Sequence, residues 1–275
     1  MTAREYTLNE VAERLGVHYM TAYRYVRTGR LWAHQRGAQW HVDEGDLELF
    51  EKSLSVKNEA TPSSTRRTPR PSIDRLVARL MAGDEPGCWT IVQEFQSGGA
   101  TAKGVYLDLF VPAMRTIGER WSLGQITVAA EHRASAVMHR LIGRMGPQFR
   151  PRGPRRGSVI VGAPSGELHG LPVALAADLL RSTGFTVVDL GADVPGDAFA
   201  ACAHDLDDLV AVAISVTASQ HRTSTARVIE ALRRSHVKAP IFIGGAGVGE
   251  RDAVRVGADR WVPDVESLVE VLRAR

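Results

Sequence analysis

Two segments rich in proline and arginine divide this 275-residue chain into three pieces. The first is residues 61–72 (TPSSTRRTPRPS) and the second is residues 149–157 (FRPRGPRRG). Proline interrupts helices and sheet ladders, and the arginines favour contact with water, so neither segment is predicted to form regular structure. We therefore expect separate domains over residues 1–60, 73–148 and 158–275, with residues 61–72 as a linker.

The composition excludes several classes of protein. With 44% hydrophobic and 24% charged residues, the chain has the make-up of a globular protein and not of a disordered one. No apolar run approaches the ~20 residues that span a bilayer, and the first residues lack the layout of a secretion signal. The two cysteines, Cys88 and Cys202, form no CxxC pair, which disfavours a cysteine zinc site. We expect a soluble, cytoplasmic protein with no membrane partner.

The first piece is predicted to form a helix, a tight turn, a second helix and a short β-hairpin. Apolar residues recur at helical spacing up to Gly16, namely Leu8, Val11, Ala12 and Leu15. Thr7 is expected to cap this helix, and Glu10 completes the sequence pattern of a capping box. A second helix is predicted from about His18 to Arg27.

The second helix and the hairpin carry positive charge, because no acidic residue lies between Arg14 and Asp43. Arginines bind phosphates, and in a helix-turn-helix the second helix enters the major groove of DNA. The residues expected to contact DNA are Tyr19, Thr21, Arg24, Arg27 and Arg36. The alternative is an ordinary amphipathic helix that exposes its arginines to solvent.

The residues from Thr7 to Leu47 resemble the winged helix-turn-helix of the MerR and excisionase type. One departure is Trp32, where many relatives have proline. The resemblance implies operator DNA as a partner. Since one small reader rarely gives specific affinity, it also implies an oligomer on repeated half-sites.

The second and third pieces differ in their periodicity. The second has four stretches of helical pattern, which predict a four-helix bundle: Ile73–Met81, Cys88–Phe95, Ala102–Trp121 and Thr127–Met145. The third has short β-branched stretches separated by helices, which predict a parallel sheet covered on both faces: Ser158–Gly162, Thr186–Leu190, Leu209–Val216 and Pro240–Ile243. Ligands of such sheets bind beyond the carboxyl ends of the strands.

The loops that follow these strands hold the candidate ligand residues. After the first strand come Glu167 and His169, with Gly170 next to the imidazole. A histidine can ligate a metal through one ring nitrogen while the other is held by a hydrogen bond, although a lone loop histidine is more often solvated. The other two strand ends carry Ser215 with Thr217, and Gly244 with Gly245. A phosphate loop is disfavoured, since GGAGVG is not GxGxxG and does not open the first βα unit.

Together these residues resemble the cobalamin-binding module that methionine synthase and corrinoid mutases share, a Rossmann-like domain of the flavodoxin type. The resemblance implies that His169 is the lower axial ligand of cobalt. It also implies that the nucleotide tail of the cofactor inserts beside Ser215, Thr217 and the glycine pair. Pro172 departs from the pattern, which has glycine at this position.

A further motif lies in the predicted bundle, where Trp121 is followed after nine residues by Glu131 and His132. The simpler interpretation is a core tryptophan beside a solvated pair. With this motif and the order of its domains, the chain resembles the CarH/LitR family of light-responsive, adenosylcobalamin-dependent repressors. The resemblance implies that Trp121, Val128, Glu131 and His132 surround the 5′-deoxyadenosyl group.

The same resemblance implies a homotetramer that holds operator DNA in the dark. Light breaks the cobalt–carbon bond, His132 takes the vacated upper position, and the tetramer dissociates and releases DNA. Two other functions stay open at this point: a cobalamin-sensing regulator that ignores light, and a corrinoid methyl carrier. The methyl carrier has no need of a helix-turn-helix and favours apolar residues at the positions of Trp121, Glu131 and His132. We expect a regulator and not an enzyme.

Overall fold

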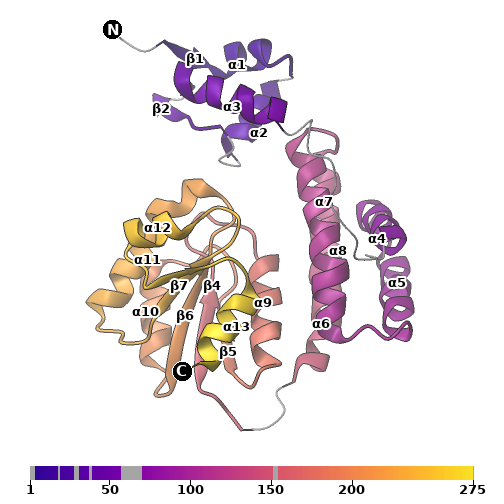
Figure 1. The fold of residues 1–275 in the computed structure, drawn as a ribbon, viewed down its shortest axis with the longest axis vertical. Helices are drawn as coiled ribbons and strands as arrows, with labels where there is room; N and C mark the ends of the chain where they lie inside the picture. Colours follow the sequence, from indigo (N-terminus) through magenta and orange to yellow (C-terminus); the bar gives the residue numbers. More distant parts are fainter. Residues whose placement is uncertain are drawn as a thin grey trace.

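The computed structural model describes residues 4–17, 19–27, 31–36, 39–56, 70–150 and 154–274. Within these ranges the chain forms a small N-terminal unit, a helical bundle and an α/β unit, in that order along the sequence (Figure 1). Among the described residues, no helix has both the length and the apolar character needed to cross a membrane.

The N-terminal unit combines three helices with a three-stranded antiparallel sheet in the order β1-β3-β2. Its elements are β1 (Glu5–Thr7), α1 (Leu8–Arg14), α2 (Tyr19–Arg27), β2 (His34–Arg36), β3 (Gln39–Asp43) and α3 (Glu44–Val56). The predicted capping box at Thr7 and Glu10 is present, so the prediction of this helix start is confirmed. The predicted hairpin is also present, while β1 was not anticipated because it is only three residues long.

The bundle contains the four predicted helical stretches, the third of which is divided into three parts. Its elements are α4 (Arg70–Ala82), α5 (Glu85–Ser97), α6 (Ala102–Gly104), the π-helical segment Val105–Phe110, α7 (Val111–Ser122) and α8 (Val128–Met145). The prediction of irregular structure up to residue 72 was wrong for its last three residues, because α4 already begins at Arg70. Proline is tolerated in the first turn of a helix, so Pro71 does not prevent this start.

The α/β unit is built on a five-stranded parallel sheet in the order β5-β4-β6-β7-β8. Its strands are β4 (Ser158–Gly162), β5 (Thr186–Asp189), β6 (Leu209–Ser215), β7 (Ile241–Gly244) and β8 (Arg260–Val262). Counted along the chain this order is 2-1-3-4-5, which is the order of flavodoxin-like sheets. Four strands were predicted; β8 was missed because its arginine and tryptophan do not form an apolar run.

Helices cover both faces of the sheet, as Figure 1 shows. They are α9 (Leu171–Arg181), α10 (Gly196–His204), α11 (Arg222–Arg234), α12 (Glu250–Val256) and α13 (Val265–Arg273). Val159 and Val161 of β4 belong to the core on the side of α9 and α13, whereas Ile160 belongs to the core under α10 and α11. Because both faces are buried, the strand sequences read as continuous apolar runs.

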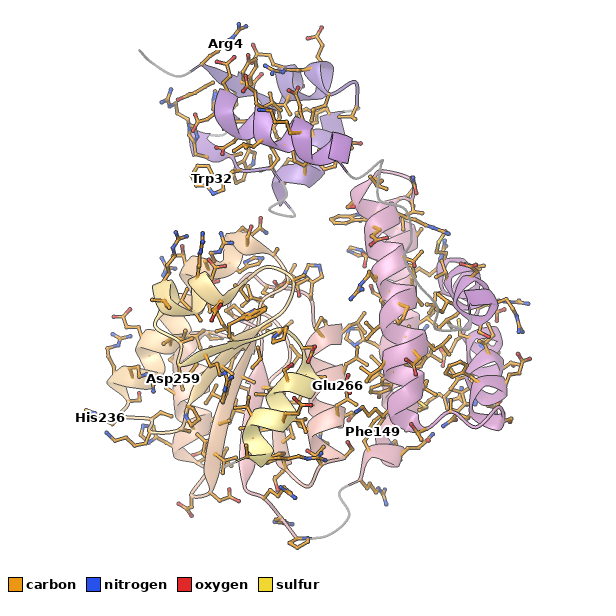
Figure 2. All side chains as sticks on the ribbon, viewed as in Figure 1. Arg4, Trp32, Phe149, His236, Asp259 and Glu266 are labelled. Atoms are coloured by element: carbon orange, nitrogen blue, oxygen red, sulfur yellow. The ribbon has the colours of Figure 1, made fainter. Side chains whose placement is uncertain are left out.

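The bundle and the α/β unit meet along α9. The Tyr106 hydroxyl, from the π-helical segment, donates to Asp178 Oδ2 of α9 at 2.7 Å, and both side chains are buried. Arg181 pairs with the other oxygen of Asp178 at 2.9 Å. Burial, and then the Asp178 carboxylate, raise the pKa of Tyr106, so the phenol keeps its proton and donates. At the same junction Lys103 pairs with Glu266 of α13 at 2.6 Å. Figure 2 labels Glu266 on the side of the α/β unit that faces the bundle.

Replacing Tyr106 with phenylalanine removes the hydroxyl that donates a hydrogen bond to Asp178 and keeps the aromatic ring in the core. Because the bond is buried and its acceptor is charged, we expect Tyr106→Phe to lower the free energy of unfolding by roughly 1.5–3 kcal/mol. Urea unfolding followed by circular dichroism measures the change. Tyr19→Phe, at an exposed tyrosine of α2, is the matched control and is expected to unfold as the parent does. Equal stability of the parent and Tyr106→Phe contradicts this assignment.

Candidate functional site

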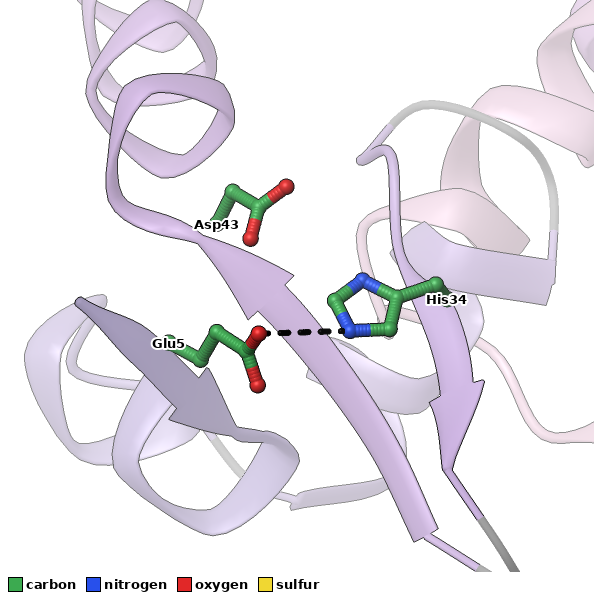
Figure 3. A group of neighbouring side chains, drawn as sticks. All are labelled: Glu5, His34 and Asp43. Atoms are coloured by element: carbon green, nitrogen blue, oxygen red, sulfur yellow. Dashed lines mark ion pairs between the residues drawn. The ribbon is translucent and has the colours of Figure 1, made fainter. Parts of the chain in front are cut away.

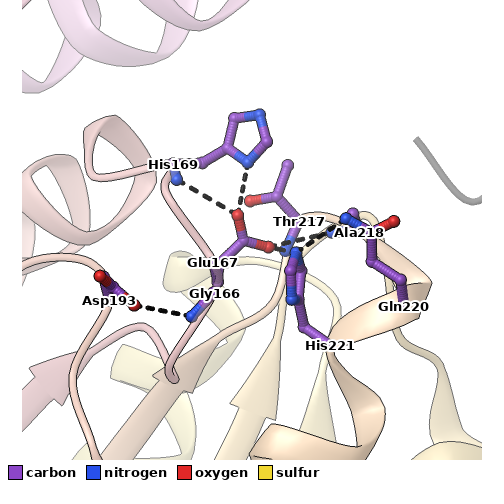
Figure 4. Close-up of polar contacts among 8 residues, drawn as sticks. All are labelled: Gly166, Glu167, His169, Asp193, Thr217, Ala218, Gln220 and His221. Carbon is purple, nitrogen blue, oxygen red and sulfur yellow. Dashed lines mark hydrogen bonds and ion pairs between the residues drawn. The ribbon is translucent and has the colours of Figure 1, made fainter. Parts of the chain in front are cut away.

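The loop between β4 and α9 carries the predicted histidine. It runs from Ala163 to Gly170, and α9 follows with Pro172 in its first turn, where a proline needs no hydrogen bond. The His169 ring points away from the sheet, beyond the carboxyl ends of the strands (Figure 4). Its side chain is 54% exposed. The imidazole is therefore accessible to a ligand that lies over this edge of the sheet.

The carboxylate of Glu167 lies beneath this ring and is fully buried. Its Oε1 is bonded to the ring Nδ1 of His169 and also accepts the His169 backbone N–H at 3.2 Å. Its Oε2 accepts the backbone N–H groups of Thr217 at 2.7 Å and Ala218 at 3.1 Å. One buried side chain thus joins the histidine loop to the loop that follows β6.

Charge and hydrogen bonding determine the protonation of this pair. Burial alone raises the pKa of Glu167, but the hydrogen bond and charge of His169, with the amide of Thr217, outweigh it and lower the pKa below its usual value. The hydrogen bond to Glu167 raises the pKa of His169 against the opposing effect of burial. Since an ionised carboxylate only accepts, Nδ1 carries a proton and Nε2 is the nitrogen that can ligate a metal.

The predicted residues at the ends of β6 and β7 also lie together. Ser215 pairs in register with Gly244, and the Val216 N–H donates to the Gly244 carbonyl at 2.8 Å. Gly245 has a φ of +110°, and a Cβ there would lie 2.4 Å from the Val216 carbonyl oxygen. Only glycine fits this position, so the two loops approach each other backbone to backbone.

The bundle residues of the predicted motif lie around the turn from α7 to α8. Trp121 is next to last in α7, and Val128 is the first residue of α8, where it is 47% exposed. Glu131 is partly buried; it accepts from Ser135 Oγ at 2.6 Å and is 2.7 Å from the Nδ1 of His132. The His132 side chain is 75% exposed. A partly buried glutamate therefore holds a ring nitrogen of an exposed histidine here as well.

Glu131 relates this turn to the histidine loop. The hydrogen bond to Glu167 raises the pKa of His169, and the charge of Glu131 acts in the same direction. The bundle also approaches this loop directly, because a Cβ at Gly170 would lie 3.5 Å from the ring of His139 on α8. The arrangement fits a cobalt corrinoid on three grounds. It offers an imidazole whose Nδ1 is held by a buried carboxylate and whose Nε2 faces outward, a glycine-lined edge of the sheet, and an apolar side chain, Val128, exposed on the bundle.

The sequence analysis missed two contributors to this site. Ala218 contributes only its backbone N–H, which no side-chain pattern reveals. Asp193, in the loop after β5, accepts the Gly166 N–H through Oδ1 at 2.7 Å (Figure 4). Its one sequence signal is an aspartate in the loop that follows a strand, where such sheets bind ligands.

The residues predicted to contact DNA are only partly described. Tyr19 and Thr21 lie at the start of α2, where the Tyr19 ring is exposed and stacks on Tyr23. Arg24 and Arg27 lie on α2, but their side chains are outside the described residues. Arg36, on β2, is exposed and pairs with Glu5 at 3.2 Å.

Glu5 belongs to a group of titratable side chains that joins the three N-terminal strands (Figure 3). Ligand atoms of Glu5, His34 and Asp43 all lie within 4.8 Å of one another, and Glu5 lies 3.7 Å from His34. Such a group can bind a cation. However, Arg36 already pairs with both carboxylate oxygens of Glu5 and offsets its charge. We interpret the group as ion pairs that hold the strands together.

Comparison with known proteins assigns the three units to families. Residues 5–54 match a family described as helix-turn-helix domain, and residues 72–145 and 157–273 match two families described as B12 binding domain. The fold is similar to that of the monomethylamine corrinoid protein of Methanosarcina barkeri. That match has a TM-score of 0.67 and 18% identity, and covers 75% of this chain and 99% of the other. The two matches to B12 binding domains indicate a cobalamin or corrinoid cofactor.

Several named proteins are similar in sequence. The chain is 25% identical to trimethylamine corrinoid protein 1 of Methanosarcina mazei over 170 residues, 60% of this chain and 78% of that protein. It is 30% identical to the HTH-type transcriptional repressor CarH of Myxococcus xanthus over 186 residues, 66% of this chain and 60% of CarH. It is also 30% identical to the repressor CarA of that organism over 216 residues, 74% of this chain and 69% of CarA. With its helix-turn-helix domain ahead of two B12-binding domains, the chain belongs to the CarH/CarA family.

Proposed function

We propose that the protein is a light-responsive transcriptional repressor that binds adenosylcobalamin, holds operator DNA as an oligomer in darkness, and releases the DNA on illumination. The observation that carries this proposal is the close approach of the bundle to the histidine loop, where a Cβ at Gly170 would lie 3.5 Å from the ring of His139 on α8. It supports one site bordered by two domains, in which a change at the cofactor acts on the bundle and on the α/β unit together.

On the lower side, His169 is the proposed axial ligand of cobalt. Glu167 fixes the tautomer and the orientation of its ring, which strengthens the Nε2 as a ligand. Ser215, Thr217, Gly244 and Gly245 are the proposed neighbours of the nucleotide tail, and Gly170, which follows the imidazole in sequence, is proposed to contact the cofactor as well. The backbone contact of the β6 and β7 loops makes a rigid border for the tail.

On the upper side, Trp121, Val128, Glu131 and His132 are the proposed neighbours of the adenosyl group. Adenosylcobalamin, when bound, supplies a cobalt–carbon bond that visible light breaks. Glu131 offers a carboxylate to the hydroxyls of the ribose, and Val128 offers an apolar surface. We assign His132 to the upper position after illumination, because Glu131 holds its Nδ1 and its ring is exposed.

The output of this switch is proposed to be a change of assembly. A single small DNA reader binds weakly, and linked readers gain ~10²–10⁴ in avidity, so dissociation alone suffices to release the operator. A winged helix-turn-helix at residues 5–54 is the proposed reader. We expect a tetramer in darkness and a smaller species in light.

A corrinoid methyl carrier is the second candidate, favoured by the similarity to the trimethylamine corrinoid protein. The helix-turn-helix domain opposes it, because carrying a methyl group requires no contact with DNA.

The light response is tested on protein purified in darkness and loaded with adenosylcobalamin. Size-exclusion chromatography and an operator gel shift, each before and after green light, measure assembly and DNA binding. We expect both the large species and the shifted DNA to disappear on illumination. If neither the mass nor the DNA binding changes after illumination, the light response is contradicted, and a regulator that senses cobalamin without light is the remaining interpretation.

The upper site is tested by the variant Glu131→Gln. The neutral amide weakens the bond to a ribose hydroxyl, so we expect the preference for adenosylcobalamin over methylcobalamin to fall by roughly fivefold. Absorbance titrations in darkness with each cobalamin measure the ratio. Glu119→Gln, on α7, is the matched control and is expected to keep the parent's preference. An unaltered preference in Glu131→Gln rules out this contact.

The lower site is tested by the variant Glu167→Gln. Its amide cannot accept from the ring and from both backbone N–H groups at once, because one of its two ends is a donor. We expect the affinity for adenosylcobalamin to fall by roughly 10–100-fold, as is typical when the partner of a metal-bound histidine is replaced. Glu230→Gln, an exposed residue of α11, is the control. Parent-like affinity in Glu167→Gln shows that His169 needs no such partner.

DNA binding is tested by the variant Arg24→Ala in the dark protein. If Arg24 neutralises a phosphate, its loss reduces affinity and lowers the slope of log K against log salt by about one unit. Gel shifts over a series of salt concentrations measure both. Lys52→Ala, on the exposed side of α3, is the control. The same slope in Arg24→Ala and the parent removes Arg24 from the interface.

A further inference from the structure

Asp193 contacts the histidine loop through two hydrogen bonds at neighbouring positions. Its Oδ1 accepts the Gly166 N–H at 2.7 Å, and its own N–H donates to the Glu167 carbonyl at 2.9 Å. The two bonds, which we call the Asp193 clamp, join the loop after β5 to the loop after β4. They hold the backbone directly on the N-terminal side of His169 (Figure 4).

The backbone of Asp193 indicates that this position is specialised. Its φ is +59°, in the left-handed region that residues other than glycine rarely adopt. Among the described non-glycine residues, His236 is the one other with a positive φ. Aspartate tolerates this conformation better than most residues, but the conformation still costs free energy. Such strain often occurs at functional sites, where the surrounding structure holds it in place.

The histidine loop needs an external constraint because of the way it folds. Glu167 is fully buried whereas Leu168 next to it is 72% exposed, so two successive side chains point in opposite directions. Gly166 has a φ of +86°. Glycine adopts positive and negative φ about equally readily, so the residue itself does not fix this conformation. Glu167 fixes the ring of His169 by its side chain, but nothing in that contact fixes the backbone of Gly166. The clamp does so.

We propose that Asp193 is a positioning residue that sets the direction in which His169 Nε2 approaches the cobalt of a bound cobalamin. This inference rests on the proposed role of His169 as the lower ligand, and it is independent of light and of DNA. Asp193 itself touches the loop backbone and not the imidazole.

Three variants separate the acceptor from the backbone conformation. Asp193→Gly keeps the left-handed backbone and removes the Oδ1 acceptor, so the Gly166 N–H loses its partner. Asp193→Asn keeps an acceptor oxygen and also tolerates a positive φ. His236→Gly, at the other left-handed position and outside this loop, is the matched control for relief of backbone strain. Circular dichroism verifies that each full-length variant is folded.

The measurement is the electron paramagnetic resonance spectrum of cob(II)alamin bound to protein labelled with ¹⁵N-histidine. A lower ligand from ¹⁵N-imidazole splits the cobalt lines into doublets, whereas the cofactor's own ¹⁴N base splits them into triplets. The spectrum therefore reports which nitrogen ligates cobalt, independently of any regulatory activity. We expect doublets in the parent, in Asp193→Asn and in His236→Gly.

In Asp193→Gly we expect the ratio of histidine-bound to histidine-free cobalamin to fall roughly tenfold, the size of one lost charged hydrogen bond. Folded Asp193→Gly that no longer retains cobalamin, while Asp193→Asn retains it, supports the inference equally. Parent-like doublets in Asp193→Gly overturn it, and so does an equal loss in Asp193→Asn. Triplets in the parent remove His169 as the ligand, and the proposed function then fails together with this inference.

Discussion

The buried carboxylate of Glu167 is the interaction on which the geometry of the candidate site depends. A charge in the interior is tolerated only when hydrogen bonds replace the water it has lost. Glu167 meets this condition with the ring and backbone of His169 on one oxygen and two backbone N–H groups on the other. All of these donors are fixed in the folded chain. The charge of Glu167 and the orientation of the His169 imidazole are therefore coupled, because turning the ring removes a donor from the buried carboxylate.

Two glutamate–histidine pairs in the structure share a chemistry but differ in how firmly they are held. In the first pair Glu167 is fully buried and has donors from two loops. In the second pair Glu131 is partly exposed, and its additional donor is Ser135 of the same helix. Because interactions in a less polar environment are stronger, the ring of His169 is held more firmly than that of His132. This difference is the one that the proposed roles of the two rings require.

Much of the architecture could be predicted from the sequence, for reasons that particular residues make plain. The strand Ser158–Gly162 is buried on both faces, so its sequence is an apolar run that predicts a strand. The spacing of Thr7 and Glu10 predicted the start of a helix. The strands β1 and β8, of three residues each, carry no such pattern. At the site, Glu167 and His169 were found because they are neighbours in sequence. Asp193 and Ala218 were not, because they lie 26 and 51 residues from Glu167 in sequence and only the fold brings them to the histidine loop.

The junction of Tyr106, Asp178 and Arg181 lies at the end of the bundle opposite the turn that carries Trp121 and Val128 (Figure 1). The 18 residues of α8 between these ends span about 27 Å at 1.5 Å per residue. If α8 tilts by about 5° about its C-terminal end, its N-terminal end moves by roughly 2 Å over that length. Because the bundle is attached to the α/β unit at the Tyr106–Asp178 junction, a small rotation there produces a larger displacement at the turn between α7 and α8.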